Sequence, residues 1–299
     1  MSTAATGVLA PNARRHAFFV AFVVVSSLAF FKTLSALVQY SLRDPSSSHI
    51  ILVPFVSFLL LYLERRRIFS VTSASMARGL IVVSGALVLY WCAHRGVIPK
   101  GGGWAFSFEI LAVILVWVGG YLCCYGMEAL GAGAFSLLFL LLMVPAPDPV
   151  LNWVINALQE GSTDIAYFVF KLVGTPVLRH GFILTLPTVT IEVAQECSSI
   201  RSSMALFITS LLAGHVYLRT GWKKLVLVFL VFPLSLIKNG IRIATLTLLS
   251  IYVDPSFLTG SLHRDGGFAF FFLALLILLP VFLCLERSDK PRKPVELMS

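Results

Sequence analysis

The stretch KLVLVFLVFPLSLIKNGIRIATLTLLS, residues 224–250, decides the class of fold that this chain can adopt. A transmembrane helix needs about 20 consecutive, mostly apolar residues, and this run is longer than that. The whole chain has the same character, because 58% of its 299 residues are hydrophobic, only 12% are charged, and the mean hydropathy is +0.91. A soluble domain of this size would need roughly 25% charged residues to cover its surface. The sequence therefore predicts a membrane protein.

Eight apolar runs are candidates for transmembrane helices, at about residues 17–38, 50–63, 79–94, 106–123, 128–145, 203–218, 224–250 and 267–285. They predict an all-α polytopic membrane protein that forms a single domain over residues 1–299. The first run, from Ala17 to about Val38, is longer than the apolar region of a signal peptide and lacks a cleavage site of small residues. We therefore interpret it as the first span.

The basic residues predict the orientation of these spans. The net charge is +9, and Lys and Arg cluster in short segments between apolar runs, as they do in cytoplasmic loops. With the N-terminus inside, the inner segments contain thirteen of the 23 basic residues, namely Arg14, Arg15, Arg65, Arg66, Arg67, Arg78, Arg219, Lys223, Lys224, Arg287, Lys290, Arg292 and Lys293. Both termini are then cytoplasmic. No basic and aromatic stripe suits nucleic acid, so the expected contacts are with membrane lipid.

The longest outer segment, residues 145–202, is not a simple polar loop. In residues 150–173, polar residues interrupt an apolar pattern as they do in an amphipathic helix, so we expect this helix at the outer interface or re-entering the bundle. From Gly174 onward, glycine, proline and alternating β-branched residues favour short strands or extended turns that lead to Cys197.

Three separated stretches bring chemically useful groups to the outer side. Asn239 and Arg242 lie one helical turn apart in the seventh span, and an arginine there costs about 2.5–3.5 kcal/mol unless it faces a cavity or a partner. The alternative is that Lys238 and Arg242 extend to lipid headgroups. Cys197 is followed by Arg201, which favours a reactive thiolate, whereas Glu192 and Glu196 oppose one, so a structural thiol is the alternative. His263 precedes the eighth span, where the alternative is an interfacial residue. A thiol, a fixed cation and a proton carrier meet the needs of acyl transfer.

The remaining cysteines carry no comparable signal. Cys92, Cys123, Cys124 and Cys284 lie in or at the ends of apolar runs, and their spacing matches neither a zinc site nor a disulfide framework. We interpret these four as packing residues. The sequence therefore predicts neither a metal nor an organic cofactor.

The order of these motifs resembles the exosortase/archaeosortase family of integral membrane cysteine transpeptidases. The resemblance rests on E-V-x-x-x-C-S-x-I-R around Cys197, on N-x-x-R-I at Asn239, and on the histidine in GSLHRDGG. SSSHIILVPF at residues 46–55, FSLLFLLLMVPAPDPV and GTPVLRHGFILTLP also look like family elements, so the resemblance covers about residues 40–285. Ser199 and Ile50 stand where the family usually has glycine, which leaves the subfamily and its sorting signal open.

The resemblance implies an enzyme that cleaves C-terminal, PEP-CTERM-like sorting signals of exported, membrane-tethered proteins and transfers them to an acceptor. It implies a location in the bacterial inner membrane with the active site on the periplasmic face. Cys197 would be the nucleophile, His263 the proton carrier and Arg242 the group that stabilises negative charge, with Asn239 and Arg201 orienting them.

Two other classes of function remain open. One is a transporter or lipid carrier that binds an anionic headgroup through Arg242, Lys238 and His263. The other is a structural subunit of a polysaccharide export apparatus, which would perform no chemistry. Only the enzyme has a use for Cys197.

Overall fold

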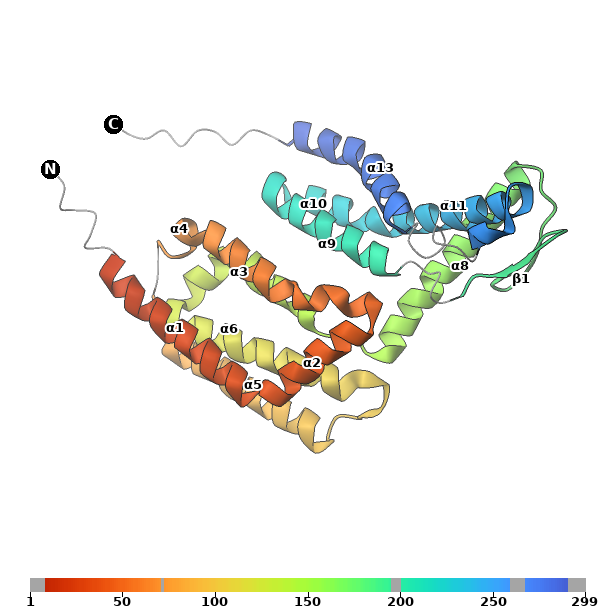
Figure 1. The fold of residues 1–299 in the computed structure, drawn as a ribbon. Coiled ribbons are helices and arrows are strands. Elements are labelled where there is room, and N and C mark those ends of the chain that lie inside the picture. The colour runs from red at the N-terminus through yellow and green to blue at the C-terminus, as the bar shows by residue number, and fades with distance from the viewer. Residues whose placement is uncertain (1–8, 71–72, 195–199, 259–266, 290–299) are drawn as a thin grey trace. The chain divides into compact units, whose positions relative to one another are not determined.

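The computed structural model describes residues 9–70, 73–194, 200–258 and 267–289 (Figure 1). Within them the chain divides into two compact units, residues 1–151 and 152–299, which are described separately below. The single domain expected over residues 1–299 stays a prediction.

The first unit is helical throughout. Its elements are α1 Leu9–Ala29, α2 Phe31–Arg43, the 3₁₀ turn η1 Pro45–Ile51, α3 Val53–Leu63, α4 Arg65–Ile68, α5 Met76–Arg95, η2 Gly101–Gly103, α6 Trp104–Ala132, α7 Ala134–Phe139 and η3 Leu140–Met143. Helices α1, α5 and α6 lie side by side (Figure 1). Glycines allow the closest approach, since a Cβ on Gly79 of α5 would lie only 2.7 Å from the carbonyl oxygen of Gly119 in α6.

The second unit combines helices with a small sheet. It contains most of α8 Asp148–Leu172, the strands β1 Leu178–His180, β2 Ile183–Thr185 and β3 Thr190–Glu192, the helices α9 Ile200–Tyr217, α10 Gly221–Phe229 and α11 Val231–Tyr252, the 3₁₀ turn η5 Pro255–Leu258, and α13 Gly267–Arg287. The strands form an antiparallel sheet in the order β1-β2-β3. They occupy the segment for which the sequence predicts short strands or extended turns, and α8 occupies the segment predicted as an amphipathic helix.

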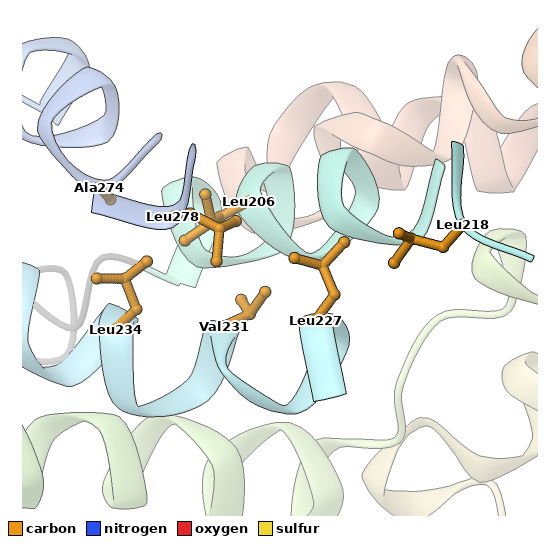
Figure 2. Packing of buried hydrophobic residues seen from close by; sticks show 7 residues of the cluster. All are labelled: Leu206, Leu218, Leu227, Val231, Leu234, Ala274 and Leu278. Atoms are coloured by element: carbon orange, nitrogen blue, oxygen red, sulfur yellow. The ribbon is translucent and has the colours of Figure 1, made fainter. Parts of the chain in front are cut away.

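Apolar side chains join the helices of the second unit. Figure 2 shows one cluster of seven buried residues, contributed by α9, by the α9–α10 turn, by α10, by α11 and by α13: Leu206, Leu218, Leu227, Val231, Leu234, Ala274 and Leu278. A second cluster joins α8 and the sheet to α11, with Phe170, Leu184 and Ala244 among its members. Burial of this apolar surface, at about 25 cal/mol per Å², determines how α9 and α11 face each other.

The helices confirm an all-α polytopic membrane protein but not its predicted eight spans. Among the described residues, five helices are long and apolar enough to cross a membrane, or up to seven spans if each of two bent helix pairs counts as one. The expected first span, residues 17–38, is such a pair, because the chain bends by 78° between α1 and α2. The other pair consists of α7 and η3 with α8.

Candidate active site

Helix α11 carries a group of polar residues on one face. Lys238 and Asn239 are only 2% and 1% exposed, and Arg242, one turn further along, is half-buried. Asn239 and Arg242 both have interaction partners. A buried lysine and a half-buried arginine in a candidate transmembrane helix are costly, so their presence together points to a site rather than to lipid contact.

The partner of Lys238 lies in the first turn of α9. The Nζ atom of Lys238 donates a hydrogen bond to the Oγ atom of Ser202. Lys238 therefore does not extend to a headgroup, which corrects that interpretation for this residue. The reason is tertiary, because the helix that faces Lys238 presents a hydroxyl within hydrogen-bond distance of its ammonium.

Helices α9 and α11 run in opposite directions. Ser202 near the start of α9 contacts Lys238 of α11. Further along α9, a Cβ added to Gly214 would lie 3.7 Å from the Cδ2 atom of Leu227 in α10, the helix that leads into α11 in one candidate span. The apolar cluster follows the same order, with Leu206 beside the Leu234 end of the row and Leu218 beside Leu227 (Figure 2). The polar contact between Ser202 and Lys238 thus lies on the same helix interface as the apolar cluster, about one turn beyond Leu206 and Leu234.

The sheet and α8 fix the chain just before Cys197. The backbone N–H of Val193 donates to the carbonyl oxygen of Phe182 over 2.9 Å, and the Nε2 atom of Gln159 in α8 donates to the carbonyl oxygen of Val193. Helix α8 also packs closely on α11, where a Cβ on Gly240 would lie 2.5 Å from Ile165 Cγ2. The same helix therefore contacts both the segment before Cys197 and α11 at Gly240, the residue that follows Asn239.

The structure describes three of the five predicted site residues. Cys197 and His263 lie outside the described residues. Asn239 and Arg242 share the buried α11 face, whereas Arg201 is exposed at the start of α9, so the structure does not bring its side chain into that interior. Sequence reasoning missed Ser202. The sequence feature that could have identified it is the position of this serine, one turn before Leu206 at the start of the apolar face of α9.

A second polar cluster lies in the first unit, where the SSSHIILVPF stretch forms η1 and the start of α3. The carboxylate of Asp44 accepts hydrogen bonds from the Ser46 backbone N–H (3.0 Å) and from the hydroxyls of Ser46 (2.6 Å) and Ser47 (2.8 Å). Burial works to raise the pKa of Asp44, but these donors outweigh it and hold the pKa below its usual value. His49 Nδ1 lies 3.2 Å from the carbonyl oxygen of Ser46.

The proline-rich element of the sequence lies in the same unit. The hydroxyl of Ser107 in α6 donates to the carbonyl oxygen of Pro145 over 2.7 Å. Within the described ranges, no group of three or more His, Cys, Asp or Glu side chains is placed to hold a metal ion. The absence of a cofactor stays a prediction.

Comparison with known protein families decides the class of this chain. A family model described as transmembrane exosortase (Exosortase_EpsH) matches residues 41–280. The chain belongs to the transmembrane exosortase family. The match confirms the resemblance read from the sequence, and it includes Cys197, the α11 face and His263. Exosortases are multi-pass membrane proteins of the cysteine protease and transpeptidase class. Neither a curated protein nor a solved structure gives a significant match.

Proposed function

We propose that this exosortase is a membrane-embedded cysteine transpeptidase that cleaves C-terminal, PEP-CTERM-like sorting signals of exported proteins and transfers the new carboxyl end to an acceptor. It acts in the bacterial inner membrane on substrates tethered by their own transmembrane helix. Both termini are cytoplasmic, and the catalytic residues Cys197, Arg242 and His263 work at the periplasmic face.

The observation that carries this proposal is the register of α9 against α11. Ser202 bonds to Lys238 across two antiparallel helices. Arg242 follows Lys238 by one turn of α11, and Cys197 precedes Ser202 by five residues in the chain. A contact this near to Cys197 in the chain and to Arg242 in α11 supports a nucleophile and a guanidinium that act at one site.

Each residue has a defined role in the proposed reaction. The Cys197 thiolate attacks the scissile carbonyl and forms a tetrahedral oxyanion, which the guanidinium of Arg242 stabilises. When this intermediate collapses, the C–N bond breaks, His263 gives a proton to the leaving amine, and a thioester remains on Cys197. The acceptor nucleophile then loses its proton to His263 and attacks the thioester, which releases the cysteine. Asn239 and Arg201 orient these groups.

The position of the site in the bundle supports the electrostatic role of Arg242. Asn239 is buried and Arg242 is half-buried, so a negative charge that develops beside them is screened less than it would be in bulk water. A substrate held by its own helix diffuses in two dimensions at a fixed depth, which removes part of the entropy cost of reaching the nucleophile.

The lipid-carrier alternative fits the α11 face less well. A carrier would present Lys238, Arg242 and His263 to an anionic headgroup, but Lys238 is buried and its ammonium donates to Ser202. A purely structural subunit gives no reason to place a buried lysine, a buried asparagine and an arginine together on one helix, with a serine as the hydrogen-bond partner of the lysine.

The proposal is tested by replacing the nucleophile. Mass spectrometry of exported proteins should show that Cys197→Ala leaves C-terminal tails uncleaved, although the variant inserts and accumulates as the parent does. Cys284→Ala is the matched control, because Cys284 is an exposed free cysteine in α13, and it should process normally. Tail cleavage retained in Cys197→Ala would exclude the cysteine mechanism and favour the carrier.

A further inference from the structure

Lys238 is a titratable side chain that the proposed reaction does not use. It is 2% exposed and shares its helix face with Asn239 and Arg242, one turn after Leu234 of the apolar cluster. Within the described part of the chain, its hydrogen-bond partner is the neutral hydroxyl of Ser202, and the nearby charge that acts on it is the guanidinium of Arg242. A buried ammonium is expensive, and one hydrogen bond to a hydroxyl offsets only part of that cost.

A packing role alone would be better served by another side chain. Leucine or methionine at position 238 would continue the apolar row that Leu227, Val231 and Leu234 begin. Alanine at position 202 would likewise extend the apolar face of α9 by one turn from Leu206. The chain instead places a donor and an acceptor at a contact five residues from Cys197. This contact fixes both the distance and the rotation of the first turn of α9 relative to α11, whereas apolar contacts tolerate sliding.

We propose that Lys238 is a positioning residue of the transpeptidase, and that through Ser202 it holds the first turn of α9 in register with the α11 face that carries Asn239 and Arg242. The inference rests on the proposed function. Lys238 exchanges no proton with the substrate and forms no bond to it. Its effect is on how well the nucleophile and the guanidinium are aligned, and a misplacement of about 1 Å in such a pair costs on the order of 10²-fold in rate.

The experiment is a double-mutant cycle with isosteric partners. Lys238→Met keeps most of the side-chain volume without the charge. Ser202→Thr and Ser202→Val have nearly the same shape and differ in the hydroxyl. Lys32→Met in α2 is the control, because Lys32 is an exposed lysine in a candidate span. The readouts are kcat and KM for tail cleavage in membranes with matched enzyme levels, together with the thermal midpoint of each variant.

We expect Lys238→Met and Ser202→Val each to lower kcat by about 10²-fold with KM unchanged, and Ser202→Thr and Lys32→Met to stay near the parent. The double variant Lys238→Met/Ser202→Val should be no slower than the slower single variant, because both substitutions break the same contact. Losses that multiply in the double variant would overturn the inference, and so would a Ser202→Val enzyme as fast as Ser202→Thr. The Thr and Val pair decides the question even if Lys238→Met does not accumulate.

A readout without substrate separates this inference from the proposed function. In a variant whose one cysteine is Cys197, N-ethylmaleimide at pH 7 should label it faster than a cysteine-containing peptide in solution, since an adjacent cation favours the thiolate. Adding Lys238→Met should slow that labelling. Labelling of Cys197 no faster than the peptide would contradict the proposed function itself. Fast labelling that Lys238→Met leaves unchanged would contradict the positioning role alone.

Discussion

The second unit buries two lysines in its helices, and their surroundings differ. Lys223 in α10 is 6% exposed and forms an ion pair with Asp289 across 3.4 Å. Asp289 also accepts from the Arg219 backbone N–H over 2.6 Å and from the hydroxyl of Thr220. Lys238 in α11 is more deeply buried and, among the described residues, is bonded to a neutral serine. A buried ion pair of this kind is typical of a structural clamp, whereas the hydrogen bond of Lys238 joins α9 to the α11 face that carries Asn239 and Arg242.

The largest expected effect distinguishes charge from geometry on the α11 face. Arg242→Lys keeps the positive charge but loses the planar fork of donors. Because loss of one oxyanion donor costs about 10²–10³ in rate, or about 2.7–4 kcal/mol, we expect tail cleavage at a few per cent of the parental rate or less. A time course of cleavage at matched enzyme levels measures it. Near-parental cleavage would remove Arg242 from the catalytic set and make its charge, like that of Lys223, a structural one.

The next effect concerns the proton carrier that the proposed mechanism pairs with this face. His263→Ala should slow both acylation and release, because a histidine with a free pKa near 6.5 can donate and accept protons at neutral pH. Single-turnover cleavage and release of the thioester are followed separately between pH 6 and 8. If the alanine variant keeps the parental rate over that range, His263 is an interfacial residue.

A milder effect is expected for the amide beside the arginine. Asn239→Ala should reduce cleavage less than Arg242→Lys does, because its proposed task is to orient the guanidinium from one turn away. The two variants are compared in one cleavage assay, with the thermal midpoint as a control for folding. A loss as large as that of Arg242→Lys would assign Asn239 a direct role at the reacting atoms.

The clamp at Asp289 should respond in the opposite way to the α11 face. Lys223→Met should lower the thermal midpoint in detergent by several degrees and leave kcat per folded molecule unchanged, because it removes the partner of a carboxylate that is only 6% exposed. A variant with parental thermal stability but reduced kcat would erase the distinction between the two lysines.

Acid provides the smallest test of the same clamp. The backbone N–H of Arg219, followed by the hydroxyl of Thr220, lowers the pKa of Asp289 below its usual value. A depressed carboxyl pKa contributes stability above the unfolded-state value of about 3.9, and this contribution is lost as pH falls through the folded pKa. We therefore expect the gap in thermal midpoint between the parent and Asp289→Asn to narrow from pH 7 to pH 3. A difference in thermal midpoint that stays constant between pH 7 and pH 3 would show that ionised Asp289 does not stabilise the fold in this way.

The elements that local patterns govern could be predicted from the sequence. Residues 150–173 read as an amphipathic helix, and α8 runs from Asp148 to Leu172. The bend after α1 could not be predicted, because residues 17–38 are apolar on both sides of Phe30 and contain neither proline nor glycine. Its cause is tertiary, since Phe30 packs edge-on against Tyr90 and Thr33 bonds to the hydroxyl of Tyr90.

The candidate site divides in the same way. The cost of an arginine in a span and the one-turn spacing of Asn239 and Arg242 are local, so the sequence predicts the α11 face. The partner of Lys238 is not local. Whether a lysine extends to a headgroup or binds Ser202 depends on which helix faces it, and that is determined by the apolar row from Leu206 to Leu234.

The position of α8 affects how well the two halves of the candidate site stay aligned. Gln159 of α8 bonds to Val193, near the last described residue before Cys197, and Ile165 packs on Gly240, the residue between Asn239 and Ile241. One helix is therefore the common reference for both halves of the site. When α8 shifts by thermal motion or with the thickness of the bilayer, both attachment points shift in the same sense. Because the two attachment points then move together, the distance between them changes little. The alignment of the site therefore tolerates movements of the helix that supports it.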